Sequence, residues 1–440
     1  MSMLTVLFGV AGLLALAAAV LPKLVAERPF STPLVMLIAG VGLGLLPLPA
    51  PYGNGWADPT AHLTSVESFA QLGILVSLAG AGLSVDRPFG LRRWASAWRL
   101  LGITMPVMIA VVALLGWWWL ALTPAVAILL GAVLAPTDPV LAGEVGVPSP
   151  DAHPEQARDN EIRSTLTIEA GLNDGLTMPF VLLALALAGQ RPELDVRWVL
   201  VALLLPVAIG VLVGLGAGRL LGWAMFRTSS SRFRLADYAD GLVLVALAFL
   251  PYAVAELVHG NGFVAVFVAA VAVRTEERSH DYHEVLHSFG RQLERLFVAI
   301  ALLGLGLALG DGLLRGFSVV ELLVAGVAVL VIRPVVGWLS LLGSSAGPHA
   351  SGAIAFFGVR GIGTIFYLAY ALDRFPVPGQ DVLWRVGALA VALSVLVHGV
   401  LAEPAIRRIE ALGGHLPTSG DPGGLTEVRR DRAAREPGAD

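Results

Sequence analysis

The sequence contains no cysteine and few charged residues. None of its 440 residues is Cys, and Asp, Glu, Lys and Arg together make up 14% of the chain. The absence of cysteine excludes disulfides, thiolate metal sites and cysteine nucleophiles. A soluble domain carries about 25% charged residues, so this chain has too few of them to cover a surface that faces water. A soluble globular enzyme is therefore excluded, and an all-α polytopic membrane protein is expected.

Other features are also missing. Lys23 is the only lysine, and the net charge of −4 gives no indication of a nucleic-acid partner. No metalloprotease H-E-x-x-H, P-loop or nucleophile-elbow G-x-S-x-G motif occurs on a plausible element. We therefore expect no enzymatic activity, no cofactor and no nucleic-acid binding.

Long apolar runs fill most of the chain. A bilayer core requires about 20 apolar residues per helix, and thirteen runs qualify as candidate spans. They lie near residues 3–22, 32–49, 67–85, 100–120, 123–143, 162–189, 197–222, 239–258, 260–274, 291–310, 317–342, 350–372 and 384–403. No Lys or Arg precedes the first run, so it is interpreted as a retained helix rather than a cleaved signal peptide. The ninth run is short, and a merged or re-entrant segment is the alternative there.

The positive charges indicate an orientation. With the N-terminus outside, the loops assigned to the inside and the C-terminal tail hold most of the 29 Lys and Arg residues. The outside loops hold only Arg191, Arg197, Arg315, Arg374 and Arg385. By the positive-inside rule this predicts an inner (plasma) membrane protein with a cytosolic C-terminus. Segment 404–412 is predicted to be a short amphipathic cap on the membrane, and the Gly- and Pro-rich tail from 413 is predicted to be disordered.

Asp138 is the first of five ionisable residues that stand out inside the predicted spans. It follows Thr137 and lies between Pro136 and Pro139. Each proline removes an N–H donor and breaks the helix, which at membrane depth is tolerated only next to protein or a watery cavity. Broken helices whose carbonyl groups and C-terminal ends favour a small cation are typical of transporters. A simple proline kink with a capping Asp is the alternative.

The next span carries Glu169, Asn173 and Asp174. Glu169 and Asn173 are four residues apart, so they share a helix face and can form a hydrogen bond. Asp174 is about 140° away from Glu169 around the helix axis, so the two carboxylates point to different places. Polar contacts between helices, without a transport role, are the alternative for Asn173 and the neighbouring threonines.

Arg333 and Arg360 lie in two later spans. Arg333 precedes Pro334, and Arg360 stands among Gly358, Gly361 and Gly363. An arginine keeps its charge and therefore needs a partner in this setting. Glu169 is the natural partner for one of them, and extension of the side chain to the headgroups is the alternative.

The five buried charges sum to one negative charge. Three carboxylates and two arginines leave a deficit that one proton or one monovalent cation can fill. A carboxylate in a poorly solvated cavity can take up a proton near neutral pH and release it when a cation binds. Competition for one site predicts obligatory, electroneutral exchange.

These residues together resemble a known family. The P-T-D-P-V run, the E-x-x-x-N-D run and the late G-x-R-G run are similar to those of the monovalent cation:proton antiporters, in the NhaP-like part of the sodium/proton exchanger branch. The resemblance covers the membrane part of the chain. It implies homodimers in which a core domain moves against a dimerisation domain. It also implies inverted repeats, about 1–190 and 239–403, joined by a linker helix at 197–222.

The resemblance also implies roles for individual residues. Asp138, Thr137, Asn173 and Asp174 would form the cation and proton site, with Na⁺ at Asp138 and Asp174. Glu169 would pair with Arg333 and bond to Asn173, and Arg360 would stand where two broken helices cross. Family members often place Ser after the Glu, whereas this chain has Ala170.

Several functions are compatible with this pattern. The expected function is exchange of Na⁺, and also Li⁺, for a proton, and a K⁺/H⁺ antiporter of the same mechanism is the first alternative. A cation channel needs a continuous pore, which fits a buried ion pair less well. A membrane scaffold or intramembrane enzyme would not need Asp174. His398, in the last span, is either a pH sensor or, in the favoured interpretation, a neutral histidine that packs between helices.

Overall fold

The described part of the chain is helical, with no strand among its residues. A computed structural model describes residues 3–25, 30–46, 57–85, 87–138, 141, 159–189, 195–227, 241–277, 283–344 and 346–412. Seven helical segments there are long and apolar enough to cross a membrane: Pro59–Leu83, Ala95–Trp119, Glu161–Ala188, Val196–Met225, Phe289–Leu313, Val319–Ser340 and Gln380–Leu401. Shorter apolar helices cover Gly12–Val25, Thr32–Gly44, Pro124–Val133 and Leu242–Leu257. The all-α prediction is confirmed, and the count of thirteen spans stays a prediction.

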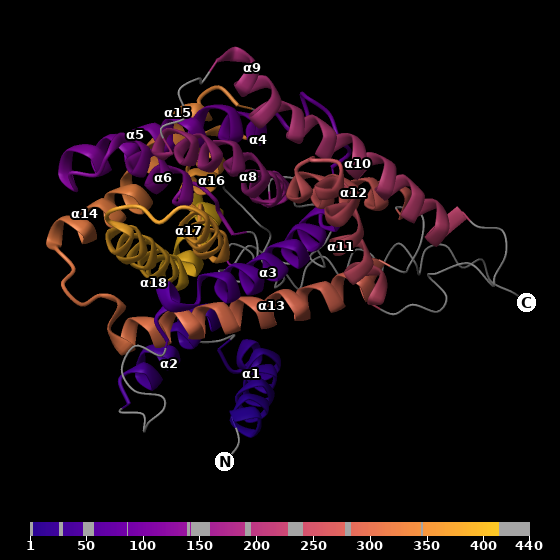
Figure 1. Ribbon diagram of the computed structural model, residues 1–440. Coiled ribbons are helices and arrows are strands. Elements are labelled where there is room, and N and C mark those ends of the chain that lie inside the picture. The colour runs from indigo at the N-terminus through magenta and orange to yellow at the C-terminus, as the bar shows by residue number, and fades with distance from the viewer. Residues whose placement is uncertain are drawn as a thin grey trace, which may run out of the picture.

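One group of helices surrounds the polar residues. It comprises α5 (Met105–Trp119), α6 (Pro124–Val133), α8 (Asp159–Ala188), α14 (Val319–Val327), α15 (Arg333–Ser340), α16 (Gly347–Phe356), α17 (Ile362–Arg374) and α18 (Gln380–Leu412). α6 packs against α5 and α8, and α14 packs against α18. In Figure 1 α17 and α18 lie together within this group. α18 includes 404–412, so this predicted surface cap continues the last helix instead of standing apart.

The other group comprises α1 (Met3–Val25), α2 (Thr32–Gly44), α3 (Leu63–Leu83), α10 (Leu205–Gly222), α11 (Leu242–Leu257), α12 (Gly262–Glu277) and α13 (His283–Ala308). α3 connects the two groups because it packs against both α12 and α17, and it lies beside α13 in Figure 1. The ninth predicted span is α12, a helix of 16 residues.

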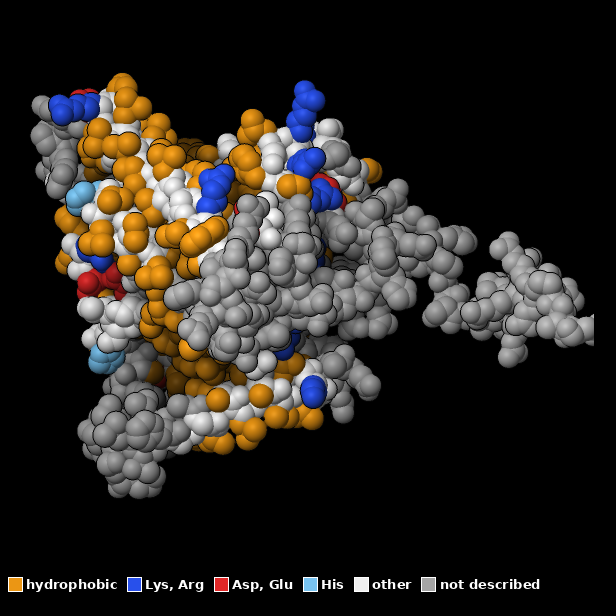
Figure 2. Space-filling model, turned by 90° about the vertical axis from the view of Figure 1, so that its right-hand side faces the viewer, with side chains coloured by type: hydrophobic (Ala, Val, Ile, Leu, Met, Phe, Trp, Pro, Cys, Tyr) orange, Lys and Arg blue, Asp and Glu red, His pale blue; other side chains and the backbone are white. Residues whose placement is uncertain are grey.

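Glycines allow the closest helix contacts. Gly210, Gly214 and Gly218 recur every fourth residue along α10 and face α12, where an added Cβ would lie at or below 2.5 Å from backbone oxygens. Small residues at this spacing let two backbones approach closely. The opposite face of α10 exposes Leu205, Leu212 and Leu220. Figure 2 shows hydrophobic side chains over much of the described surface of one face, as expected for a surface that contacts lipid.

Prolines explain three of the irregular helical turns. Short π-helical turns at Leu100–Thr104, Val199–Leu204 and Ala328–Ile332 each end two residues before a proline, at positions 106, 206 and 334. Proline cannot donate the usual helical hydrogen bond, and a π turn accommodates the resulting mismatch within a continuous helix.

Candidate functional site

Two helices are interrupted where they meet. α6 ends at Val133 and is followed by the non-helical residues 134–138, while α16 ends at Phe356 and α17 begins only at Ile362. The two breaks are bonded directly, because the Asp138 N–H donates to the Val359 carbonyl over 2.8 Å. Backbone groups that a helix would normally satisfy are therefore available to side chains and ions at this crossing. Pro139 lies outside the described residues.

Asp138 is held by backbone donors at the crossing. Its side chain is 5% exposed. Its Oδ1 accepts from the Leu141 N–H over 3.1 Å, and its Oδ2 accepts from the Ile362 N–H over 3.3 Å. Gly361 leaves room for it, since a Cβ there would lie 2.8 Å from the Asp138 Cβ. The Asp138 carboxylate is thus held in place by backbone N–H groups on both sides of the crossing.

Asp174 faces the same place from α8. A small cavity is lined by Asp138, Asp174, Thr137 and Pro136 together with Ser77 of α3 and Gly361 and Gly363 of the α16–α17 break. Asp174 is 6% exposed, and its Oδ1 has no hydrogen-bond partner. A buried polar atom without a partner is costly, and here it borders a cavity lined by further oxygen atoms. Oxygen donors are the chemistry that small hard cations require.

Asn173 is bonded to the first broken helix. Its Nδ2 donates to Thr137 Oγ1 over 2.6 Å, so it joins α8 to the crossing. The predicted bond between Asn173 and Glu169 is wrong: Asn173 Oδ1 has no partner, and its amide nitrogen is directed to Thr137 instead. The unwound stretch at Thr137 supplies the acceptor for Asn173, and Glu169 accepts from Arg333.

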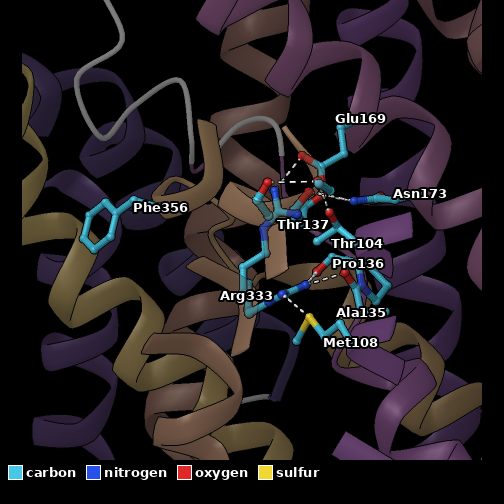
Figure 3. Close-up of polar contacts among 12 residues, drawn as sticks. Thr104, Met108, Ala135, Pro136, Thr137, Glu169, Asn173, Arg333 and Phe356 are labelled. Carbon is cyan, nitrogen blue, oxygen red and sulfur yellow. Dashed lines mark hydrogen bonds and ion pairs between the residues drawn. The ribbon is translucent and has the colours of Figure 1, made fainter. Parts of the chain in front are cut away.

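Glu169 lies against Arg333. Arg333 NH2 donates to Glu169 Oε2 over 2.7 Å, and both side chains are almost completely buried. Figure 3 shows both residues near Thr137 and Asn173. Gly358 makes room for the arginine, because a Cβ there would lie 3.0 Å from Arg333 Cδ. The pair is electrically neutral, and neither residue lines the Asp138–Asp174 cavity.

Arg360 occupies the crossing itself. Its NH1 donates to the carbonyls of Ala135 and Pro136, at 2.8 Å for Pro136, and its NH2 lies 3.0 Å from Met108 Sδ. Both carbonyls lie in the non-helical stretch that follows α6, where no helical N–H is available to them, so the guanidinium binds the first break. Arg360 therefore ties one broken helix to the other.

Sequence reasoning missed a further buried pair and two contacts. Glu321 of α14 accepts from Arg385 of α18 over 2.7 and 2.9 Å, with the Glu321 side chain 5% exposed. Tyr367 of α17 donates its hydroxyl proton to the Asp174 carbonyl, and Ser77 lines the cavity. From the sequence, Arg385 is assigned to an outside loop and Glu321 is not singled out, because a single residue near the start of a span gives no signal of a partner in another span.

No group of three or more His, Asp or Glu side chains that could hold a resident metal ion occurs in the described ranges. The cavity instead offers two carboxylates together with neutral oxygen atoms, such as those of Thr137 and Ser77. A site with few carboxylates suits a singly charged ion that must also leave, since strong binding by many charged ligands slows release.

A family model for the transmembrane part of sodium/hydrogen exchangers matches residues 10–408. The chain belongs to the sodium/hydrogen exchanger family. Among curated relatives, the K(+)/H(+) antiporter NhaP2 of Shewanella sp. (strain ANA-3) is 24% identical over 270 residues, covering 59% of this chain and 45% of the relative. The K(+)/H(+) antiporter NhaP of Alkalimonas amylolytica is 28% identical over 322 residues, covering 71% and 52%. The chain thus spans about half the length of these relatives.

The fold is shared with a solved member. The sodium proton antiporter MjNhaP1 from Methanocaldococcus jannaschii superposes with a TM-score of 0.71 at 18% identity, covering 90% of this chain and all of that one. An electron-microscopy structure of the same protein gives 0.72 at 19% identity and covers 95% of this chain. The predicted antiporter fold and family are confirmed.

Proposed function

We propose that this exchanger-family protein is a secondary transporter that exchanges one monovalent cation for one proton, without enzymatic activity and without a cofactor. The observation that carries the proposal is the Asp174 carboxylate, which is buried, has an oxygen without a partner and borders a cavity shared with Asp138. Membership of the sodium/hydrogen exchanger family supports it.

The charges favour electroneutral exchange. Glu169 and Arg333 compensate each other, and so do Glu321 and Arg385. Arg360 adds one positive charge at the crossing, against the two negative charges of Asp138 and Asp174. The remaining single negative charge is neutralised by either guest, a proton or a cation such as Na⁺. A site that is neutral with either guest moves no net charge in a full cycle.

Na⁺ is the proposed cation, and K⁺ is the second candidate. The two curated relatives described above carry names of K(+)/H(+) antiporters, whereas the superposed structure is of a sodium proton antiporter. Ala170 has no side-chain oxygen, so the neutral ligands of the cation would come from Thr137, Ser77 and water.

The proposal extends to the setting of the protein. It lies in a prokaryotic plasma membrane with its N-terminus outside, surrounded by lipid, and works as a homodimer. The distribution of Lys and Arg supports this orientation, and the exposed apolar face of α10 supports burial of that face against lipid.

The test is a pH-gradient dye assay on purified protein in proteoliposomes. Na⁺, Li⁺ and K⁺ are added in turn, with and without a valinomycin clamp. The proposal expects Na⁺ and Li⁺ to collapse the gradient at a rate that the clamp does not change. A response to K⁺ alone would move the function to K⁺/H⁺ exchange, and no response to any of the three cations would contradict it.

A further inference from the structure

Two polar side chains of α18 face the break between α16 and α17. Ser394 and His398 are 0% and 1% exposed, and because they are four residues apart they lie on one face of the helix. Neither lines the cavity of Asp138 and Asp174. Buried polar groups are normally bonded, and the partners of these two are backbone atoms of the break.

Ser394 binds the C-terminal end of the break. Its Oγ accepts from the Arg360 N–H over 2.9 Å. Arg360 lies two residues before the first residue of α17, in a stretch where no helical carbonyl is available to this N–H. An unpaired N–H at this depth would be costly, so the serine hydroxyl replaces the missing backbone acceptor.

His398 binds the N-terminal end of the break. The His398 Nε2 lies 2.9 Å from the Phe356 carbonyl oxygen, and it donates to this oxygen in the tautomer that carries the hydrogen on Nε2, in which Nδ1 accepts from the Ser394 hydroxyl. Its Nδ1 lies 3.2 Å from Ser394 Oγ and 2.8 Å from the Ser394 carbonyl oxygen. The imidazole also packs on Phe356, with ring centroids 4.9 Å apart. Figure 3 shows Phe356 to the left of the other labelled residues, with its ring directed away from them.

These bonds fix both ends of a five-residue stretch that holds Asp138. Phe356 is the last residue of α16, and Arg360 comes just before α17. Between them, the Val359 carbonyl accepts from the Asp138 N–H, and beyond them the Ile362 N–H donates to the Asp138 carboxylate. A shift of this stretch therefore moves the donors that orient Asp138.

We propose that Ser394 and His398 are positioning residues for cation binding: by bonding to Arg360 and Phe356 they hold residues 357–361 in the geometry that orients Asp138. The inference rests on the proposed function. A misplaced ligand weakens cation binding and has a smaller effect on the conformational change that follows binding. The pair therefore determines the cation concentration for half-maximal exchange rather than the maximal rate.

The test compares Ser394→Ala and His398→Leu with the conservative variants Ser394→Thr and His398→Gln in proteoliposomes. Ser394→Ala and His398→Leu are expected to raise the half-saturating Na⁺ concentration by about tenfold, the factor for one lost buried hydrogen bond. The maximal rate should stay within about twofold. The threonine hydroxyl and the glutamine amide keep the donor and acceptor groups, so these variants should lie close to wild type.

Val395→Ala is the matched control. Val395 is on the same helix, next to Ser394 and 1% exposed, and its hydrocarbon side chain can form no hydrogen bond to the break. It is expected to lower the melting temperature without changing half-saturation. An unchanged half-saturating concentration in Ser394→Ala, or an equal increase in Val395→Ala, would overturn the proposal.

Amide hydrogen exchange separates this inference from the proposed function. In detergent, the amide hydrogens of Arg360 and its neighbours in 357–361 should exchange faster in Ser394→Ala than in wild type. In Val395→Ala they should exchange at the wild-type rate. If wild-type protein transports none of the three cations, the proposed function fails while this measurement still decides the role of the pair. Unchanged protection in Ser394→Ala would contradict the positioning role.

Discussion

Glu169 and Asp174 lie five residues apart on α8 and are similarly buried, at 3% and 6% exposure, but their surroundings are opposite. Glu169 bonds to Arg333, whose positive charge neutralises it. Asp174 has an oxygen with no partner and borders a cavity. The comparison teaches that burial does not determine what a carboxylate does in this protein. The paired one connects helices, and the unpaired one is available to a guest.

The sharpest test of this difference is Asp174→Asn. The variant removes the exchangeable negative charge and keeps the shape, so exchange should fall to the level of empty liposomes. The melting temperature should not decrease, because no ion pair is lost and an unpaired buried charge is unfavourable in the folded state. Dye-detected exchange and a thermal melt on the same preparation check both parts. Robust exchange in this variant would remove the distinction between the two carboxylates.

The reverse outcome is expected at the paired site. Arg333→Ala or Glu169→Ala should reduce the free energy of unfolding by about 3–5 kcal/mol, because each leaves an uncompensated buried charge. A double variant, Glu169→Leu with Arg333→Met, should regain most of the loss, since an apolar pair of similar volume can replace a buried ion pair. Thermal melts of the three variants provide the measurement. Melting temperatures equal to wild type in the single variants would count against the pairing.

Gly363→Ala tests the space around the unpaired carboxylate. An added Cβ would lie 2.7 Å from Asp174 Oδ1 and 3.1 Å from Pro136 Cβ, so something in the site must move. Exchange is expected to need about tenfold more cation for half-saturation. The control is Gly352→Ala in α16, where an added Cβ meets nothing within 4 Å. Equal effects of the two substitutions would show that the cavity is not the cause.

The smallest effect is expected at the second ion pair. Glu321→Gln weakens the bonds to Arg385, whose side chain is 15% exposed and hence partly solvated. Because water can compensate part of the loss, we expect a decrease in unfolding free energy of about 1–2 kcal/mol and normal exchange. A larger decrease in unfolding free energy than that caused by Glu169→Ala would show that the more exposed ion pair is not the one that contributes less to stability.

Much of this arrangement was predictable from the sequence. Prolines around Thr137–Asp138 and glycines around Arg360 mark backbone breaks, and charges in apolar runs are rare enough to single out each charged residue of the site. The angular separation of Glu169 and Asp174 follows from helix geometry alone. These signals are local, and each is readable from a few adjacent positions.

The remaining contacts depend on which helices meet. Asn173 bonds to Thr137 rather than Glu169 because the unwound stretch brings an acceptor near it, and no spacing within α8 encodes that. The Glu321–Arg385 pair and the contacts of Ser394 with the break join different helices in the same way. Ser77 enters the cavity from α3, the helix that packs on both groups.

The most direct measurement of the central claim is proton release on cation binding. Purified wild-type protein in weakly buffered detergent solution is titrated with Na⁺ near the pH of half-maximal exchange, and released protons are followed with a pH dye. If one unpaired carboxylate holds either guest, wild type should release protons in proportion to bound Na⁺, and Asp174→Asn should release none. Na⁺ binding to wild type without proton release, or equal release by Asp174→Asn, would contradict the account.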